Sequence, residues 1–197
     1  MHKTLAEYIL HLKDAMPLDM CEKLIETYDS VSHSDPNYVK RESKIFDFAE
    51  INMLDHEAFA EFREPMGELM RAVNNFYMDK THNALRDKLV CYEPMKDYEA
   101  PRIKRYEPNQ GIFDWHIDAA DQSSSKRAVV MFWYLNDVAE GGETIFDIGD
   151  EVAIKPEAVV CFPPTWQYPH KGATPISGPK YVVSSYVWLP VDHPMCD

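Results

Sequence analysis

The apolar positions in the first hundred residues recur at helical spacing. They fall three or four residues apart between Leu18 and Tyr28, and again in a longer stretch from about Asp55 to about Asn83. This period is typical of amphipathic helices that pack one face against a core. Pro65 stands inside the second stretch, where a proline kinks or splits a helix. Residues 1–100 are therefore predicted to be mainly helical.

Local signals indicate the start of the first helix and a loop after its end. Asp19 comes shortly after Pro17 and is a candidate N-cap, because a short carboxylate accepts hydrogen bonds from the free N–H groups of a first helical turn. The stretch His33–Ser43 is polar and charged and has no helical period, which predicts a loop between the two helices.

After Pro101 the pattern changes to short stretches of β-branched and aromatic residues, separated by turn signals such as Gly141-Gly142 and Pro163-Pro164. The predicted strands are Ile103–Tyr106, Ile112–Ile117, Ala128–Leu135, Thr144–Phe146, Val152–Ile154, Ala158–Phe162 and Tyr181–Leu189. Short strands at this spacing predict a small sandwich or barrel. The chain is thus expected to combine a helical N-terminal layer with an all-β C-terminal half.

Composition places the chain among ordinary folded proteins and narrows its partners. Of its 197 residues, 45% are apolar and 27% are charged, which excludes disorder across the whole chain. The 20 Lys and Arg residues against 33 Asp and Glu residues leave a net charge of −13. Proteins that neutralise phosphates show the opposite balance, so no nucleic-acid partner is expected.

Neither a membrane anchor nor a disulfide framework is expected. The longest uninterrupted apolar run, Ala128–Leu135, is too short to span a bilayer. The first residues mix charged side chains with apolar ones and lack the apolar core of a secretory signal, so a cytoplasmic location is expected. The cysteines have neither zinc-knuckle spacing nor the density of a disulfide scaffold; they are Cys21, Cys91, Cys161 and Cys196.

Two histidines in the β half are candidates for metal binding. His116 and Asp118 stand two residues apart on a predicted strand, so their side chains leave the same face. His170 lies in a later segment that a closed barrel can bring beside them. Two imidazoles and one carboxylate on one side of a metal suit an Fe(II) oxygenase. A surface histidine beside an aspartate, and a histidine buried with an ordinary hydrogen bond, remain the alternatives.

A third candidate is Lys180, which opens the last predicted strand ten positions after His170. If its side chain points into the mouth of the barrel, the ammonium group needs an anionic partner there. A dicarboxylate that chelates the metal at one end would offer its far carboxylate to this lysine. The alternative is a solvated lysine beside Pro179.

The motifs of the β half, taken in their order along the chain, resemble the prolyl 4-hydroxylase branch of the Fe(II)/2-oxoglutarate dioxygenases. The resemblance covers about Arg102 to Leu189, and its minimal single-domain bacterial, algal or viral members are the most similar in organisation. The motifs that carry the resemblance are His116-x-Asp118, Tyr134-Leu135-Asn136, Gly141-Gly142-Glu143-Thr144, His170 and Lys180. The segment Arg105-Tyr106-Glu107-Pro108-Asn109 precedes them and also resembles the family. Leu18–Ile25 resembles the helix that often begins these domains.

The resemblance implies an α+β fold, in which a double-stranded β-helix (jelly-roll or cupin-like) core carries an N-terminal helical layer. One domain would span 1–197, with helical support in 1–100 and the catalytic core in 101–190. The implied Fe(II) ligands and catalytic residues are His116, Asp118 and His170. The residues implied to bind 2-oxoglutarate are Lys180 at its distal carboxylate, with Tyr106, Tyr134 and Thr144 beside it. Phe113 and Trp115 depart from the family pattern next to the metal histidine and are candidates for lining the substrate entrance.

The implied activity is hydroxylation of an unactivated C–H bond in a proline-containing peptide or protein, with release of succinate and CO2. Fe(II), 2-oxoglutarate and O2 would be required, and ascorbate is expected as reductant, bound as in related enzymes. Two alternatives remain: an oxygenase of a free amino acid or other small molecule, and a non-catalytic metal-binding module of the same fold.

Overall fold

The computed structural model describes residues 3–13, 15–86, 95–148, 151–154 and 158–189. Its helical segments are two 3-10 turns, η1 (Leu5–Tyr8) and η2 (Glu57–Phe62), and two α-helices, α1 (Leu18–Ser30) and α2 (Arg63–Arg86). The strands are β1 (Leu10–Lys13), β2 (Tyr38–Glu42), β3 (Phe46–Asn52), β4 (Asp97–Tyr98), β5 (Arg102–Tyr106), β6 (Ile112–His116), β7 (Arg127–Tyr134), β8 (Thr144–Asp147), β9 (Glu151–Ile154), β10 (Ala158–Phe162), β11 (His170–Gly172) and β12 (Lys180–Trp188).

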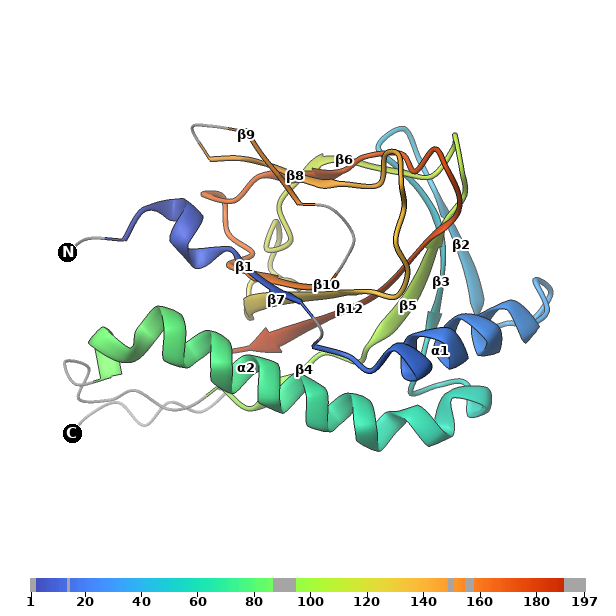
Figure 1. Ribbon diagram of the computed structural model, residues 1–197, viewed down its shortest axis with the longest axis horizontal. Coiled ribbons are helices and arrows are strands. Elements are labelled where there is room, and N and C mark those ends of the chain that lie inside the picture. Colours follow the sequence, from blue (N-terminus) through green and yellow to red (C-terminus); the bar gives the residue numbers. More distant parts are fainter. Residues whose placement is uncertain (1–2, 14, 87–94, 149–150, 155–157, 190–197) are drawn as a thin grey trace.

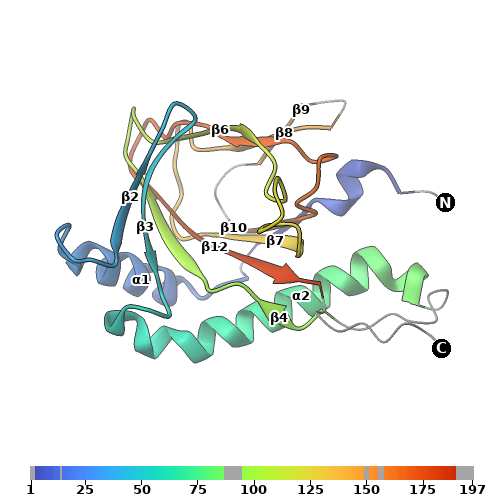
Figure 2. The ribbon, with the colours of Figure 1, turned by 180° about the vertical axis from the view of Figure 1, so that it is seen from behind.

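The described strands form one antiparallel sheet that curls into an open barrel. Along its main path the order is β1-β10-β7-β12-β5-β3-β6-β11-β8-β9, with β2 paired to β3 and β4 paired to β12. In Figure 1, β6, β8 and β9 form an upper layer, and β1, β7, β10 and β12 form a lower one. Strands β2, β3 and β5 join the two layers along one side, and the view from behind shows β4 beside the end of β12 (Figure 2). This curled antiparallel sheet confirms the predicted double-stranded β-helix.

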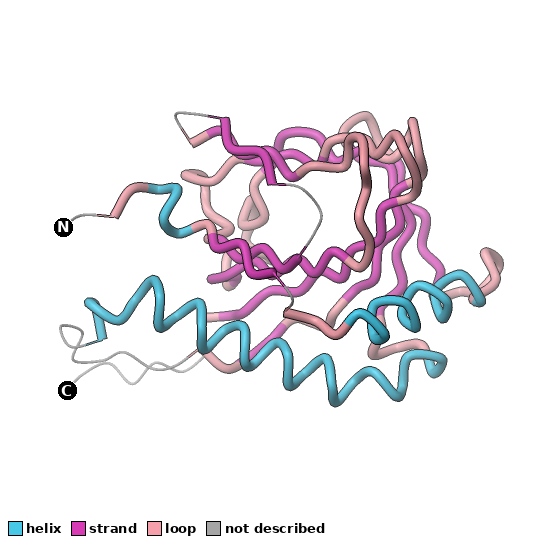
Figure 3. The backbone as a smooth tube through the Cα atoms, viewed as in Figure 1, coloured by secondary structure: helices cyan, strands magenta, loops and turns pink. Residues whose placement is uncertain are grey.

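Both α-helices lie on the same side of the curled sheet (Figure 3). Helix α1 buries Cys21, Leu24 and Tyr28, which recur three or four residues apart, and α2 buries a similar stripe that includes Met66 and Met70. These side chains form one core with the outward face of the lower sheet layer. The helices therefore support the sheet from outside and leave the interior of the barrel open to other side chains.

The last strand, β12, takes part in two cores because its side chains alternate between two faces. Tyr181, Val183 and Val187 pack in the core beneath the helices. Val182 and Tyr186 belong to a second cluster inside the barrel, which is rich in aromatic side chains. Lys180 has the same parity as this inward-facing set, so the period-two pattern of the strand directs its ammonium group into the barrel.

The structure bears out both predicted helices and corrects their details. Helix α1 begins at Leu18 with Pro17 at the N-cap position, so the Asp19 cap is wrong: Asp19 already lies in the first turn. Pro65 neither kinks nor splits α2, because it falls in the first turn, where the missing N–H costs no helical hydrogen bond. The residues before it, Glu57–Phe62, form a separate 3-10 turn.

The predicted loop at His33–Ser43 is wrong, because strand β2 runs from Tyr38 to Glu42 within it. The mainly helical character expected of residues 1–100 is likewise incomplete, since β1, β2 and β3 also lie there. Strand β2 pairs on one side with β3, and three of its five residues are exposed, so its sequence carries little apolar signal. All seven strands predicted after Pro101 are present, with ends shifted by one residue or so. Among the described helices, none is both long and apolar enough to cross a membrane.

Candidate metal and co-substrate site

Three side chains expected to bind metal converge inside the barrel. Strand β6 ends at His116, strand β11 begins at His170, and these two residues lie directly opposite each other in the antiparallel pair. Asp118 comes two residues after the end of β6 and turns toward both histidines. One potential ligand atom from each of the three residues lies within 4.8 Å of the other two. Such a grouping allows all three atoms to contact one ion.

Each member of this triad has one polar atom fixed by the protein. His116 Nδ1 lies 2.7 Å from the backbone oxygen of Asp114, and His170 Nδ1 lies 3.1 Å from that of Tyr168. A carbonyl oxygen can only accept, so both Nδ1 atoms carry the proton and both Nε2 atoms keep a lone pair. Asp118 Oδ1 accepts a hydrogen bond of 2.7 Å from the Tyr186 hydroxyl.

The second polar atom of each triad residue is buried without a hydrogen-bond partner. These atoms are His116 Nε2, Asp118 Oδ2 and His170 Nε2. His170 Nε2 lies only 3.2 Å from Asp118 Oδ2, a distance at which two atoms with lone pairs repel unless a proton or cation lies between them. The three residues therefore fit a divalent cation with nitrogen and oxygen ligands.

The electrostatics of the triad favour a cation over protons. Burial is the main cause that lowers the pKa of His116 to about 4, with the neighbouring His170 adding to the effect and Asp118 opposing it. Burial also lowers the pKa of His170, against the attraction of Asp118. Both imidazoles are consequently neutral near pH 7, the form in which histidine binds metals.

Aromatic rings hold the two imidazoles in place and keep the triad dry. Phe113 stacks on His116 with the ring centroids 3.6 Å apart and the planes 5° from parallel. Phe146 and Phe162 contact His170 at centroid distances of 5.5 and 4.8 Å. These rings restrict rotation of the ligands and lower the local dielectric, which strengthens any charge interaction at the site.

Lys180 lines a cavity together with His116 and His170. We call this space the inner cavity; its lining includes Tyr106, His116, Tyr134, Thr144, His170 and Lys180. Lys180 is 4% exposed, and its Nζ donates a 2.7 Å hydrogen bond to the Gly142 carbonyl. Burial lowers the pKa of Lys180 to about 7, while Glu143 opposes this shift. A carboxylate reaching Lys180 would relieve the desolvation of the ammonium group.

The other three residues expected at the co-substrate surround this lysine. The rings of Tyr106 and Tyr134 lie 5.5 and 4.9 Å from Lys180 Nζ, which is cation–π range. Tyr106 is the register partner of Lys180 between β5 and β12. The Tyr134 hydroxyl and Thr144 Oγ1 are joined by a hydrogen bond. The inner cavity thus brings all seven expected site residues to one place, either in its wall or, for Asp118, in the triad at its end.

The glycine pair before Thr144 shapes the lysine end of the cavity. Gly142 adopts φ of +77°, a left-handed conformation that other residues avoid. Its carbonyl is the acceptor for Lys180, and a Cβ atom at this position would lie 3.5 Å from Lys180 Cδ. Glycine therefore allows both the backbone turn and the close approach of the lysine stem.

Three further residues of the site were not predicted from the sequence. Tyr186 holds Asp118, while Ser184 Oγ and Lys104 line the inner cavity, and Ser184 Oγ is buried without a hydrogen-bond partner. The sequence does contain a signal for them, because side chains alternate between the two faces of a strand. Ser184 and Tyr186 share the inward parity of Lys180 on β12, and Lys104 shares that of Tyr106 on β5.

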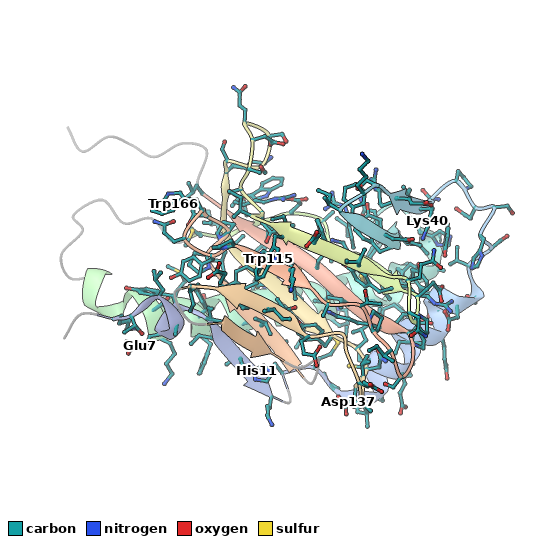
Figure 4. All side chains as sticks on the ribbon, turned by 90° about the horizontal axis from the view of Figure 1, so that it is seen from above. Glu7, His11, Lys40, Trp115, Asp137 and Trp166 are labelled. Carbon is teal, nitrogen blue, oxygen red and sulfur yellow. The ribbon has the colours of Figure 1, made fainter. Side chains whose placement is uncertain are left out.

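The two residues that depart from the family pattern have different surroundings. Phe113 lines both the inner cavity and a second hollow, which we call the outer groove; its lining also includes Phe46, Phe48, Lys104, His116 and Asp118. Trp115 is in the lining of neither hollow, is 42% exposed and lies at the surface, as does Trp166 (Figure 4). Lys171 Nζ covers the ring of Trp115 at 4.8 Å. Phe113 is therefore the better placed of the two to contact a substrate.

Comparison with known proteins finds a match to an oxygenase family over the part of the chain that forms the site. Residues 101–188 match the model of the 2OG-Fe(II) oxygenase superfamily. A sequence search of curated proteins finds no match. The matched segment holds all seven expected site residues, so the family assignment and the site concern the same part of the chain.

Solved structures of prolyl hydroxylases share the fold. A prolyl-4-hydroxylase of Pseudomonas putida has a TM-score of 0.65 and 16% identity, with 93% of this chain and 94% of that chain covered. A Trichoplax adhaerens prolyl hydroxylase, solved with a peptide fragment of hypoxia inducible factor, has a TM-score of 0.68 and 12% identity, covering 92% and 84%.

A viral collagen prolyl hydroxylase from Paramecium Bursaria Chlorella virus-1, solved as its 2OG complex, has a TM-score of 0.57 and 20% identity, covering 91% of this chain and 95% of that one. At these identities the likeness establishes the fold. The chain therefore has the fold of the prolyl hydroxylases, and its residues 101–188 are similar to the 2OG-Fe(II) oxygenase superfamily.

Proposed function

We propose that this chain hydroxylates an unactivated C–H bond of a prolyl residue in a protein or peptide, using Fe(II), 2-oxoglutarate and O2 and releasing succinate and CO2. One observation carries the proposal: three unpartnered ligand atoms meet in a buried triad, and the cavity beside them contains a buried lysine. A metal chelator with a distal carboxylate matches both features. The catalytic unit would be a single domain over 1–197, with 101–190 as its β core.

In this proposal His116, Asp118 and His170 hold the metal and leave its remaining positions to other ligands. An Fe(II) ion bound there, with 2-oxoglutarate and O2, supplies the oxidative decarboxylation to succinate and CO2 and the insertion of one oxygen atom into a C–H bond. Tyr186 keeps the Asp118 carboxylate oriented through its hydrogen bond. Phe113 fixes the ring of His116 and excludes water from that side.

The lysine end of the inner cavity would select the co-substrate. Lys180 pairs with the distal carboxylate of 2-oxoglutarate, and its bond to the Gly142 carbonyl holds the ammonium group in position beforehand. Tyr106 and Tyr134 flank it, and the hydrogen bond between Tyr134 and Thr144 orients that hydroxyl. A buried charge in a low-dielectric cavity discriminates strongly between an acid and a neutral analogue.

The relatives favour a peptide as the primary substrate. The Trichoplax adhaerens enzyme is a prolyl hydroxylase in complex with a peptide fragment, and this chain shares its fold over most of its length. The outer groove lies beside His116 and Asp118 and is large enough to seat a side chain and its neighbours. We therefore infer that a proline-containing peptide enters by this groove, with Phe113 against its ring.

The test is succinate formation from 2-oxoglutarate by protein reconstituted with Fe(II) without oxygen and then exposed to O2. The assay is run alone, with proline-containing peptides, and with the Asp118→Ala variant as control; parallel samples contain or omit ascorbate, which we expect to sustain turnover as reductant. Stimulation by peptides with a mass gain of one oxygen supports the proposal. Stimulation only by small molecules would favour the alternative oxygenase, and no turnover despite bound metal and 2-oxoglutarate would favour a non-catalytic module.

A further inference from the structure

Lys104 is a buried lysine whose ammonium group the mechanism above does not use. It lies on β5, is 8% exposed, and shares the inward face of Tyr106. Among the described residues its Nζ has neither a hydrogen bond nor an ion-pair partner, and the ring of Phe48 lies 5.0 Å away. Lys104 lines the hollows of the site, so an anion that enters them can pair with its ammonium group.

The two carboxylates that attract the Lys104 charge, Glu50 and Asp118, have other partners, and Asp118 accepts a hydrogen bond from Tyr186. Glu50 is its register neighbour on β3, but Glu50 accepts a 2.9 Å hydrogen bond from Arg41. Glu99 in turn receives Arg102 and Arg127, at 2.6 and 2.9 Å. These pairs also line the outer groove. Among the described lysine and arginine side chains that line the outer groove, Lys104 is thus the one that forms no ion pair with a carboxylate.

The position of Lys104 joins the two hollows of the site. It lines the inner cavity together with His116 and His170, and it lines the outer groove together with His116 and Asp118. An anionic group bound to Lys104 would therefore lie beside the metal, on the side from which the groove approaches. Burial lowers the pKa of Lys104 while Glu50 and Asp118 oppose this, and an arriving anion would restore the charged form.

We propose that Lys104 binds a carboxylate of the primary substrate at the inner end of the outer groove. This inference rests on the proposed oxygenase function and narrows its substrate to a carboxylic acid whose reacting carbon lies close to the acid group. Within the proposed function, the acid group belongs to a C-terminal prolyl residue or to an acidic side chain beside the prolyl residue. A free amino acid would instead fit the alternative oxygenase of small molecules. The apolar part of such a substrate would pack against Phe46, Phe48 and Phe113, which form the aromatic wall of the groove.

The surroundings favour a carboxylate over a phosphate group. Phosphate sites gather several donors, commonly arginines or the N–H groups of a helix start. The arginines of the outer groove are already engaged with Glu50 and Glu99, and Lys104 alone remains. One ammonium group against an aromatic wall matches a singly charged acid.

A first test asks whether the charge of Lys104 serves a ligand or the fold. Lys104→Met keeps the length of the side chain and removes the charge, so its midpoint of thermal unfolding should equal or exceed that of the unaltered protein. Lys126→Met is the matched control, because Lys126 also lies over an aromatic ring, that of Trp188, but is exposed. A lower midpoint for Lys104→Met alone would overturn the view that its charge is unpartnered.

The second test uses pairs of compounds that differ only in charge. The probes are L-proline and L-prolinamide, glycylproline and its amide, and a capped Ala-Glu-Pro-Ala peptide with its Gln counterpart. Stimulated succinate formation is measured for each pair with the Fe(II)-reconstituted protein. We expect the acid of at least one pair to stimulate about tenfold more than its amide. The preference should disappear in Lys104→Met, persist in Lys126→Met and be retained in part by Lys104→Arg.

The outcomes separate this inference from the proposed function. Succinate formation, alone or with any peptide of the first assay, tests the oxygenase itself, and its absence from every sample would defeat the proposed function. Turnover in which amides match acids, or in which no acid stimulates, would overturn the role of Lys104 alone. A rise in the half-saturating 2-oxoglutarate concentration of Lys104→Met that equals that of Lys180→Met would also overturn it, because Lys104 would then bind the co-substrate.

Discussion

The imidazole rings of His116 and His170 face each other across two paired strands, with their centroids 4.3 Å apart and their planes tilted by 54°. Each ring donates its Nδ1 proton to a backbone carbonyl, so both Nε2 lone pairs are directed into one small space beside Asp118. The strand register therefore sets the distance between two ligands, and the carbonyls set their orientation.

Removing a triad member should abolish metal binding and leave the fold intact. For His116→Ala or Asp118→Ala we expect the affinity for Fe(II) to fall by more than the roughly 10- to 100-fold that is typical of losing an outer partner of a ligand. Succinate formation should fall below detection. Calorimetric titration with Fe(II) under nitrogen and circular dichroism measure the two effects, with His33→Ala at an exposed histidine as control. Turnover retained by either variant would rule out this triad.

Lys180→Met should weaken 2-oxoglutarate binding far more than Fe(II) binding. The change removes one charged hydrogen-bond donor from the wall of the inner cavity, which corresponds to a loss on the order of 10- to 100-fold in affinity. Titrations of the metal and of the co-substrate on the same preparation separate the two. If both affinities drop together, Lys180 has a structural role instead.

The affinity for 2-oxoglutarate should depend on pH through Lys180. The pKa of this lysine is lowered to about 7 by burial, and only the ammonium form pairs with a carboxylate. Affinity is therefore expected to be constant below about pH 7 and to weaken by about tenfold per pH unit above it. Calorimetry between pH 6 and 9 tests this expectation. Lys180→Arg should flatten the profile, because a guanidinium group stays charged throughout this range.

Tyr186→Phe should weaken metal binding by about 10- to 100-fold, because it removes the hydrogen bond that orients Asp118. Tyr181→Phe is a matched control on the same strand, since the Tyr181 hydroxyl donates an equally short 2.7 Å bond to Asp29 outside the barrel. Fe(II) titration of both variants, with unfolding midpoints for comparison, distinguishes the two roles. Equal Fe(II) affinities in the two variants would show that Tyr186 does not support the metal site.

The features that could be predicted from the sequence depend on the spacing of neighbouring residues or on the order of motifs along the chain. The spacing of His116 and Asp118 predicted that the two side chains lie together, although Asp118 comes after the end of β6 and not within it. Lys180 opens a strand whose alternation is strong. The chain order of these residues carried the resemblance to the oxygenases. Seven of the eight strands after Pro101 are apolar enough on at least one face to be visible as separate stretches, whereas β11 has only three residues and was not predicted.

The features that it did not predict depend on contacts between distant segments. Strand β2 was missed because it lies at the margin of the sheet and exposes most of its side chains, so its composition matches that of a loop. Tyr186 supports Asp118 from 68 residues away along the chain. Lys104 was missed because a lysine on a strand is normally solvated, and only the curl of the sheet shows that this one faces inward.

The backbone acceptors of the two imidazoles affect how the protein can change over time. A side-chain acceptor can be lost by one mutation, whereas the carbonyls of Asp114 and Tyr168 are present whatever residues occupy those positions. The backbone conformation alone therefore keeps the proton on Nδ1 and the lone pair on Nε2 in both histidines. Residues around the outer groove can be exchanged, and new substrates explored, without disturbing the form in which the histidines meet their metal.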